Sequence, residues 1–207
     1  MSDQEPVRER FSDDEATPAR KRPRPGERRL QILQTLAAML EQPGAERVTT
    51  AGLAAKIGVS EAALYRHFAS KAQMFEGLID FVDQSVIGLI RQVTDREPAG
   101  PVQAGRIVAL LLQFAEKNPG MSRVMIGDAL VLEHERLQER INLLFDKIEA
   151  QLRQSLKATE SATPTADAQL VASVLVAFMQ GRLQRFARTG FKRLPSEHLQ
   201  AALGRML

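Results

Sequence analysis

The sequence contains no cysteine and no tryptophan, and only one tyrosine. Without cysteine, a disulfide framework, a thiol nucleophile and a cysteine-ligated metal site are all excluded. The longest strongly apolar run, Ile107–Leu112, is far shorter than the roughly 20 residues that a membrane-spanning helix needs. The N-terminus is charged and has no apolar core, so no signal peptide is expected. These absences predict a cytoplasmic protein.

Residues that would mark an enzyme are scattered along the chain. The three histidines, His67, His134 and His198, lie far apart, and no pair has the spacing of metal ligands. No phosphate-binding loop or dinucleotide-binding fingerprint is present. We therefore expect neither catalysis nor a bound cofactor.

Charge is unevenly spread along a chain whose formal net charge is only +3. Residues 1–19 contain two arginines and six acidic residues, whereas residues 20–75 contain ten Lys and Arg against four acidic residues. Residues 76–207 are nearly neutral, with sixteen cations and fifteen acids. A basic excess confined to one short block favours a polyanionic partner, although an ordinary solvated surface would have the same composition.

Helical periodicity dominates the sequence after residue 26. Apolar residues recur every three or four positions, and no segment has the alternation and turn of a β-hairpin, so we expect an all-α fold of about nine helices. The first helix would begin near Glu27 and end at Pro43-Gly44, with an inward stripe of Leu30, Leu33, Leu36, Ala37 and Leu40. Longer helices are expected at about 71–94, 102–117, 121–130, from there to 157, 165–189 and 196–206.

Residues 49–71 contain the signals of a helix-turn-helix. Leu53 and Ala54 would let two short helices pack closely, and Gly58 stands where the chain must turn, because glycine adopts a positive φ without steric penalty. An ordinary helical hairpin would share these signals, so spacing alone leaves both interpretations open. The residues expected to cap the second, third and fourth helices are Thr49 or Thr50, Ser60 and Ser70.

The third helix would present a small polar face to the major groove, where its first turns can reach base edges. Tyr65 could stack on a sugar or bond a phosphate, and His67 and Lys71 lie where backbone contacts are common. The helix N-termini at Thr49 and Thr50 offer N–H groups to phosphates. The candidate DNA-contacting residues are Arg28, Arg29, Thr49, Thr50, Ser60, Glu61, Ala62, Tyr65, Arg66, His67 and Lys71.

Residues 1–25 are rich in proline and charge and nearly free of apolar side chains, which predicts a disordered arm. Its basic end continues into Arg28 and Arg29 at the start of the first helix. A solubilising tail is one interpretation of this stretch. Its position beside residues 49–71 favours another, in which these arginines contact DNA phosphates.

The order of residues in TTAGLAAKIGVSEAALYRHFASKAQMFEGLI, residues 49–79, resembles the N-terminal signature of the TetR family of bacterial regulators. The matching residues are Leu53-Ala54, Gly58-Val59-Ser60, Leu64-Tyr65, His67-Phe68 and Ser70-Lys71. This resemblance implies a three-helix DNA-binding head and a larger helical body that dimerises. We therefore expect an arm at 1–25, a DNA-binding domain at 26–72 and a dimerisation and partner-binding domain at 73–207.

The last two helices predict a homodimer interface. Small and apolar residues recur at helical spacing in residues 165–189, where Ala177 and Gly181 would let a partner helix approach closely. Two such helices from each subunit would form a four-helix interface, and a palindromic DNA site needs two reading heads. The alternative is that these faces pack within one chain. The expected interface residues are Leu170, Val174, Ala177, Phe178, Gly181, Leu199 and Leu203.

Two body segments, KNPGMSRVMIGDAL (117–130) and RLQERINLLFDKIEAQLRQ (136–154), resemble the nucleoid occlusion branch of the TetR family. That resemblance implies a sequence-specific DNA-binding dimer that, when bound to DNA, binds the C-terminal tail of the tubulin-like division protein FtsZ. It would then antagonise FtsZ polymers and block septum formation over the nucleoid. In that branch the tail lies between the fourth and fifth helices, at positions that correspond here to Phe81, Leu110, Lys117 and Asn118.

Two other functions remain compatible with the residues. A ligand-responsive TetR-type repressor would control a few nearby genes, although the nearly all-apolar helix at 102–117 offers little to hold a polar ligand. The third possibility is an interaction protein whose head no longer binds DNA. Many chromosomal binding sites would indicate nucleoid occlusion, and one or two sites would indicate a local repressor. The absence of any gel shift with DNA would indicate an interaction protein.

Overall fold

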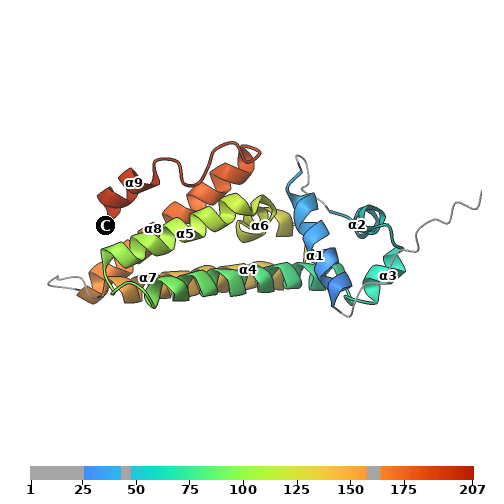
Figure 1. Cartoon of the computed structure of the whole chain (residues 1–207), viewed down its shortest axis with the longest axis horizontal. Coiled ribbons are helices and arrows are strands. Elements are labelled where there is room, and N and C mark those ends of the chain that lie inside the picture. Colours follow the sequence, from blue (N-terminus) through green and yellow to red (C-terminus); the bar gives the residue numbers. More distant parts are fainter. Residues whose placement is uncertain (1–25, 43–47, 158–163) are drawn as a thin grey trace, which may run out of the picture.

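The computed structural model describes residues 26–42, 48–157 and 164–207, so the expected arm at 1–25 and the break at Pro43-Gly44 lie outside the described residues. Within them the chain forms α-helices and one 3₁₀ turn without any strand, which confirms the all-α class. Figure 1 shows an elongated molecule with α1–α3 at one end and the longer helices side by side at the other. The elements are α1 (Glu27–Leu40), α2 (Thr50–Ile57), α3 (Glu61–Tyr65), α4 (Lys71–Thr94), α5 (Pro101–Lys117), α6 (Pro119–Met125), the 3₁₀ turn (Asp128–Leu130), α7 (Glu135–Leu156), α8 (Pro164–Arg188) and α9 (Leu199–Met206).

The short helices of the head begin and end where local groups satisfy the backbone, as expected. The hydroxyls of Thr49, Ser60 and Ser70 each accept a hydrogen bond from the backbone N–H three residues later, and so cap α2, α3 and α4. Gly58 ends α2 with φ 76°, a left-handed conformation that glycine adopts without strain. The turn between α2 and α3 is therefore fixed mainly by interactions close in sequence.

A single hydrophobic core runs through head and body, from Ile32 on α1 to Leu203 on α9. One expectation about α1 is wrong: Leu30 is exposed, whereas Ile32, which was not in the expected stripe, is fully buried. Two residues along a helix turn the side chain through about 200°, so burying Ile32 directs Leu30 to solvent. The α1 stripe that packs on α4 and α6 is Ile32, Leu36 and Leu40, with Leu33 and Ala37 beside it.

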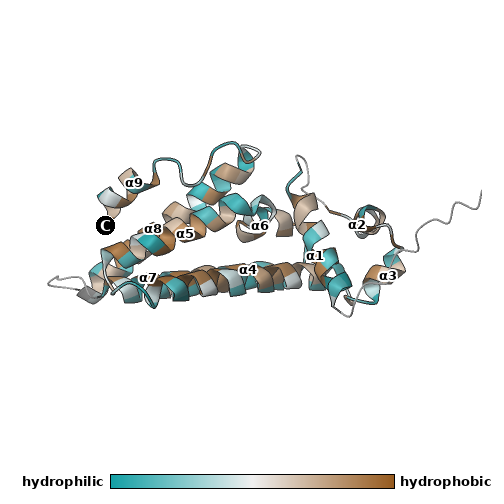
Figure 2. Ribbon diagram, in the orientation of Figure 1, coloured by the Kyte–Doolittle hydropathy of each residue, from teal (hydrophilic) through white to brown (hydrophobic). Residues whose placement is uncertain are grey.

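Amphipathic helices build the body. The face of α7 that includes Leu137, Ile141 and Ile148 is buried, as its apolar spacing predicts, and α7 makes its most extensive contacts with α8. Figure 2 shows hydrophobic and hydrophilic residues alternating along these helices, as this one-sided burial requires. No helix in the described ranges is long and apolar enough to cross a membrane.

Ion pairs join α4 to α7 along their length. The pairs are Glu76–Arg136, Asp80–Arg140 and Asp83–Lys147, and Lys71 at the start of α4 pairs with Glu133 just before α7. We call these four pairs the α4–α7 ladder. Residue numbers rise together on both helices, so α4 and α7 run parallel. Exposed pairs each contribute little to stability, but a row of them specifies how far one helix is shifted along the other.

Candidate nucleic-acid interface and partner surfaces

The third helix of the head carries an exposed polar surface on an apolar base. Leu64 and Phe68 are almost completely buried and anchor it to the core. Tyr65 has a large aromatic side chain, yet it is 44% exposed to solvent. The other exposed candidates on this segment are Ser60, Glu61, Ala62, Arg66 and His67.

A side-chain hydrogen bond joins the start of α2 to the start of α3. The hydroxyl of Thr50 at the start of α2 donates to Oε2 of Glu61 at the start of α3, at 2.6 Å. The Thr49 hydroxyl is occupied by its cap, as is that of Ser60. The hydroxyls of Thr49, Thr50 and Ser60 are therefore already engaged in hydrogen bonds that stabilise the head. The Glu61 carboxylate is directed toward α2.

Arg29 is bound within the head rather than free. Its guanidinium donates to the backbone carbonyl of His67 at 2.8 Å and lies 4.0 Å from the centre of the Phe68 ring. It fastens α1 to the end of α3 and so positions the recognition helix. Arg28 bonds the neighbouring Gln31, at 2.7 Å, on the surface of α1.

Lys71 is also engaged. Its ammonium group pairs with the carboxylate of Glu133, which is mostly covered, and lies 5.7 Å from the centre of the Phe75 ring. A phosphate contact by Lys71 would have to compete with this pair. Glu133 connects the beginning of α4 to the turn before α7, a contact between residues 62 positions apart that no local pattern revealed.

The four positions of the expected partner groove divide between exposed and occupied side chains. Phe81 on α4 is about half exposed, a large apolar group without cover, and Lys117 at the end of α5 is exposed. The Asn118 amide donates to the carbonyl of Phe114 at 2.7 Å, which stabilises the break between α5 and α6. Leu110 is partly buried on α5, which packs directly on α4.

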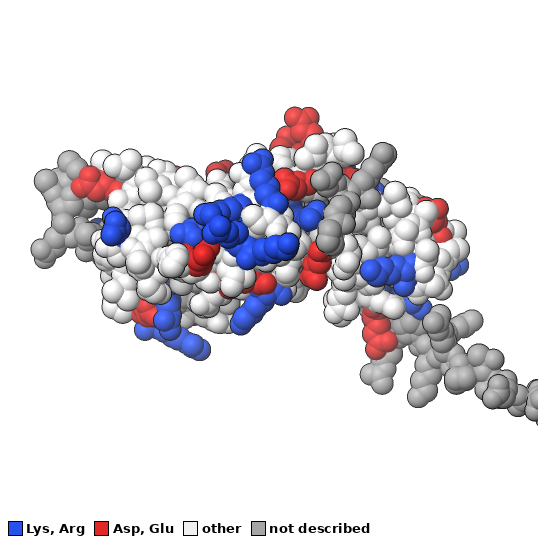
Figure 3. All heavy atoms as spheres, turned by 90° about the horizontal axis from the view of Figure 1, so that it is seen from above, with Lys and Arg blue, Asp and Glu red and all other residues white. Residues whose placement is uncertain are grey.

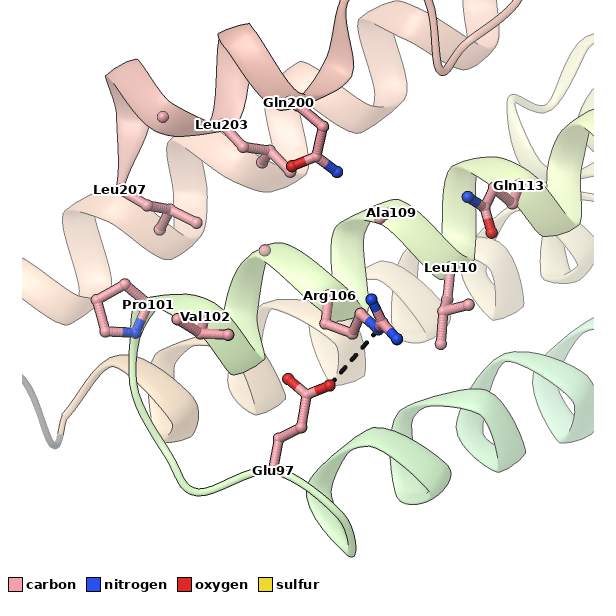
Figure 4. A pocket seen from close by; sticks show the side chains of 12 residues that line it. Glu97, Pro101, Val102, Arg106, Ala109, Leu110, Gln113, Gln200, Leu203 and Leu207 are labelled. Carbon is pink, nitrogen blue, oxygen red and sulfur yellow. Dashed lines mark ion pairs between the residues drawn. The ribbon is translucent and has the colours of Figure 1, made fainter.

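Leu110 also lines an open cavity of about 570 Å³ between α5 and α9. Figure 4 shows Gln113 of α5 and Gln200 of α9 on its walls, with Leu203 and Leu207 reaching down from α9. Glu97 and Arg106 form an ion pair at 3.5 Å on the opposite rim, drawn as a dashed line. Phe81, Lys117 and Asn118 do not line this cavity, so it is a neighbour of the expected groove and not the groove itself.

The expected dimer face is exposed on α8 but not on α9. Leu170 and Val174 are 63% and 46% exposed, and Ala177 and Gly181 continue the same exposed stripe, with Phe178 partly covered beside it. Leu143 on α7 adds an exposed apolar side chain that the sequence did not lead us to expect. The position of Leu143 on the polar face of an amphipathic helix is the sequence pattern that predicts its exposure.

Leu199 and Leu203 differ from expectation. They are only 5% and 6% exposed within a single chain, and Leu203 lies against α5 at Gly105. Gly105 permits this approach: a Cβ there would lie 3.2 Å from Leu207 and 3.8 Å from Leu203. The apolar face of α9 is therefore used within the subunit, and the four-helix interface cannot include these two leucines as free contacts.

No group of three or more His, Asp or Glu side chains in the described part of the chain is arranged to hold a metal ion. The polar residues on the head and the apolar stripe on α8 are suited to binding macromolecules. These surfaces agree in kind with a regulator that reads DNA as a dimer.

Two family models match successive parts of the chain. Residues 32–78 match the model described as bacterial regulatory proteins, tetR family, and residues 101–205 match an SlmA-like model described as tetracyclin repressor-like, C-terminal domain. A protein of Idiomarina loihiensis named nucleoid occlusion factor SlmA is 49% identical over 177 residues, covering 84% of this chain and 90% of the relative. The chain belongs to the SlmA family of TetR-type proteins. SlmA proteins of Shewanella oneidensis (49% identical, 83% of this chain and 88% of the relative) and Vibrio vulnificus (48%, 84% and 90%) are similar over the same extent.

Solved structures resemble this SlmA-family chain in fold alone. A transcriptional regulator from Rhodococcus has a TM-score of 0.70 at 19% identity, over 86% of this chain and 92% of that one. The regulator FadR of Bacillus subtilis, solved with stearoyl-CoA, has a TM-score of 0.67 at 12% identity, over 86% and 96%. The names of these relatives describe regulators and a nucleoid occlusion factor, not enzymes.

Proposed function

We propose that this SlmA-family chain is a DNA-dependent division inhibitor. As a homodimer bound to specific palindromic sites on the nucleoid, in the cytoplasm, it would bind the C-terminal tail of FtsZ and antagonise FtsZ polymers. The observation that carries this proposal is the extent of the similarity: the 49% identity is measured over 84% of the chain, and the body has its own match to an SlmA-like model at residues 101–205. Solved regulators that share only the fold are 12% and 19% identical.

The DNA-binding part of the proposal rests on the head. An exposed Tyr65 and Arg66 stand on a helix whose base is locked by Leu64, Phe68 and Arg29, so the reading surface is held rigidly before DNA arrives. A preorganised surface loses little conformational entropy on binding. The basic excess of residues 20–75 would supply the sequence-independent attraction to phosphates.

Replacing Tyr65 by alanine should abolish specific DNA binding and leave the fold intact. The exposed ring contributes little to the core, whereas one recognition contact is worth about 1–3 kcal/mol per half-site. In a dimer that reads two half-sites, we expect affinity for a specific duplex to fall about thirtyfold or more in a fluorescence anisotropy titration. Affinity for random DNA should change much less.

Tyr65→Phe is the informative companion, because it keeps the ring and removes the hydroxyl. Near-normal binding by Tyr65→Phe would assign the contribution to stacking, and a loss equal to that of Tyr65→Ala would assign it to a hydrogen bond. Gln154→Ala on α7 serves as a body control. Unchanged operator affinity in Tyr65→Ala would show that another face of the head reads DNA.

The dimer part of the proposal rests on the α8 stripe. A contiguous row of Leu170, Val174, Ala177 and Gly181 is exposed, and its small residues would let a second copy of α8 approach closely. Nothing within the described chain lies within 4 Å of a Cβ built on Gly181. An apolar row of this kind on a regulator that reads palindromes is typical of an isologous interface.

The FtsZ part of the proposal is tested by polymer sedimentation. DNA-bound wild-type protein should reduce the FtsZ pelleted with GTP, and Phe81→Ala should abolish the effect without altering DNA affinity. An aromatic anchor at a peptide-binding site contributes about 2 kcal/mol or more, which corresponds to a loss of roughly thirtyfold or more in tail affinity. Phe81 is half exposed in the free protein, so its loss should not unfold the chain.

Leu132→Ala is the matched control, since Leu132 is an exposed large apolar residue outside the expected groove. If DNA-bound wild-type protein left FtsZ polymers intact, the proposal would be wrong. Genome-wide mapping then separates this function from that of a local repressor: sites spread along the chromosome support occlusion, and one or two sites beside the gene support repression.

A further inference from the structure

Arg123 on α6 is a buried cation without an acidic partner in the described part of the chain. Its relative exposure is only 9%, and its Nε atom is fully covered and has no hydrogen-bond partner. Among the described residues, no carboxylate lies within ion-pair distance of its guanidinium. An arginine removed from water in this way costs several kcal/mol unless an anion or a set of hydrogen bonds compensates it.

The guanidinium lies beside the turn that ends α8. The N–H of Phe191 bonds the carbonyl of Phe186 at 2.9 Å and that of Gly190 bonds Ala187 at 3.1 Å, which together form a Schellman cap. Gly190 and Phe191 both have positive φ, 61° and 65°, and the second is unusual for a residue with a side chain. This turn places the Phe191 ring edge-on to Phe186, with centres 5.0 Å apart, and 5.2 Å from the Arg123 guanidinium.

Further cations surround this turn. Arg185, Arg188, Lys192 and Arg193 are all exposed, and residues 182–196 contain no acid. Figure 3 shows Lys and Arg gathered over the middle of the body, where the α8–α9 connection lies in Figure 1. Two carboxylates are linked to this segment: Glu116 accepts a hydrogen bond from the N–H of Ser196, and Glu197 pairs with Arg193 at 3.7 Å. Arg185, Arg188 and Lys192 have no ion pair among the described residues.

We propose that Arg123 and the cations of this turn form a binding site for a small polyphosphate, such as a nucleoside triphosphate. A planar guanidinium fork matches the oxygens of a phosphate, and the exposed cations favour a ligand with several negative charges over a single carboxylate. Only a slender group such as a terminal phosphate can reach a side chain that is nine-tenths covered. A DNA duplex is too bulky for it, so this site is distinct from the head.

Isothermal titration of the full chain with pyrophosphate and with ATP, at constant ionic strength, tests the proposal. We expect saturable binding, and Arg123→Met should raise the Kd at least about tenfold, as expected for loss of a charge-assisted hydrogen bond. Without ligand, Arg123→Met should melt at the same or a higher temperature, because it replaces an unpaired buried charge by an apolar chain of similar length. Arg96→Met, at an exposed arginine after α4, is the matched control.

A second variant keeps the test decisive if Arg123→Met fails to fold. Arg188→Ser with Lys192→Ser leaves the core untouched and should weaken pyrophosphate binding severalfold and reduce its salt dependence. Tyr65→Ala should bind pyrophosphate normally, because the head is not involved. The proposal is overturned if wild-type protein does not bind pyrophosphate, or if both Arg123→Met and the double variant bind it normally. Vesicles of phosphatidylglycerol and phosphatidylcholine test a lipid headgroup as the source of the phosphate. Binding to these vesicles without binding to pyrophosphate would also overturn the proposal.

Discussion

Gly120→Ala is expected to lower the thermal stability of the protein strongly. A Cβ at residue 120 would lie 2.2 Å from the carbonyl oxygen of Ala37 and 3.0 Å from its carbonyl carbon. Both obstacles belong to the backbone of α1, so no rotamer change can remove them. Helices α1 and α6 would have to move apart, and overpacking of this kind costs about 3 kcal/mol or more.

Differential scanning calorimetry provides the measurement. For a chain of this size, a loss of about 3 kcal/mol lowers the Tm by roughly 6–12 °C. Gly88→Ala is the control: Gly88 lies within α4, and no atom is within 4 Å of the place that its new methyl group would take. Removing a helix-interior glycine should stabilise the protein slightly, by up to about 1 kcal/mol. Equal melting temperatures for Gly120→Ala and wild type would mean that α1 and α6 do not pack as closely as described.

Val174→Lys is expected to convert the dimer into a monomer and thereby remove most of the DNA affinity. Val174 lies within the exposed α8 stripe, so a lysine there is harmless to the isolated subunit. In an isologous interface the substitution appears on both subunits and places two desolvated ammonium groups in one apolar contact. Such like-charge contacts cost several kcal/mol, which raises the dimer Kd on the order of a thousandfold.

Sedimentation equilibrium over a range of concentrations measures this change, and circular dichroism checks that helix content is kept. Gln92→Lys, at an exposed position on α4, adds the same charge away from the stripe and should leave the dimer unchanged. Leu143→Lys on α7 should weaken the dimer if the interface extends to that helix. A Val174→Lys protein that still sediments as a dimer would place the interface elsewhere.

The parts of the fold that the sequence predicted are those set by neighbours along the chain. Thr49, Ser60 and Ser70 cap their helices because each hydroxyl needs only the N–H three residues later. Gly58 turns the chain because its own φ requires a glycine. These interactions do not depend on where distant helices lie, so residue type and spacing are enough to find them.

The predictions that the structure contradicts concern apolar side chains that could have packed in either of two places. Both Leu30 and Ile32 could have faced the core, and only the position of α4 and α6 decides for Ile32. The leucines of α9 are suited to a partner as well as to their own chain, and the absence of a side chain on Gly105 brings α9 onto α5. Choices of this kind depend on packing between elements far apart in the sequence.

The ion pairs between α4 and α7 are predictable when two distant parts of the sequence are compared. Acidic residues at 76, 80 and 83 and basic residues at 136, 140 and 147 lie at helical spacing on two long helices, which together predict paired faces. Arg29 gave no such signal, because its partner is the backbone carbonyl of His67. Backbone acceptors carry no residue signature, so contacts of this kind require a structure.

The α4–α7 ladder has a consequence for recombination among related regulators. Helix α4 starts directly after the recognition helix, and its acidic side chains meet basic ones on α7 about sixty residues later. A head exchanged together with α4 would carry Glu76, Asp80 and Asp83 to a foreign α7, where the matching cations need not exist. Viable chimaeras should therefore keep α4 and α7 from the same parent, so the segment inherited intact extends well beyond the DNA-reading module.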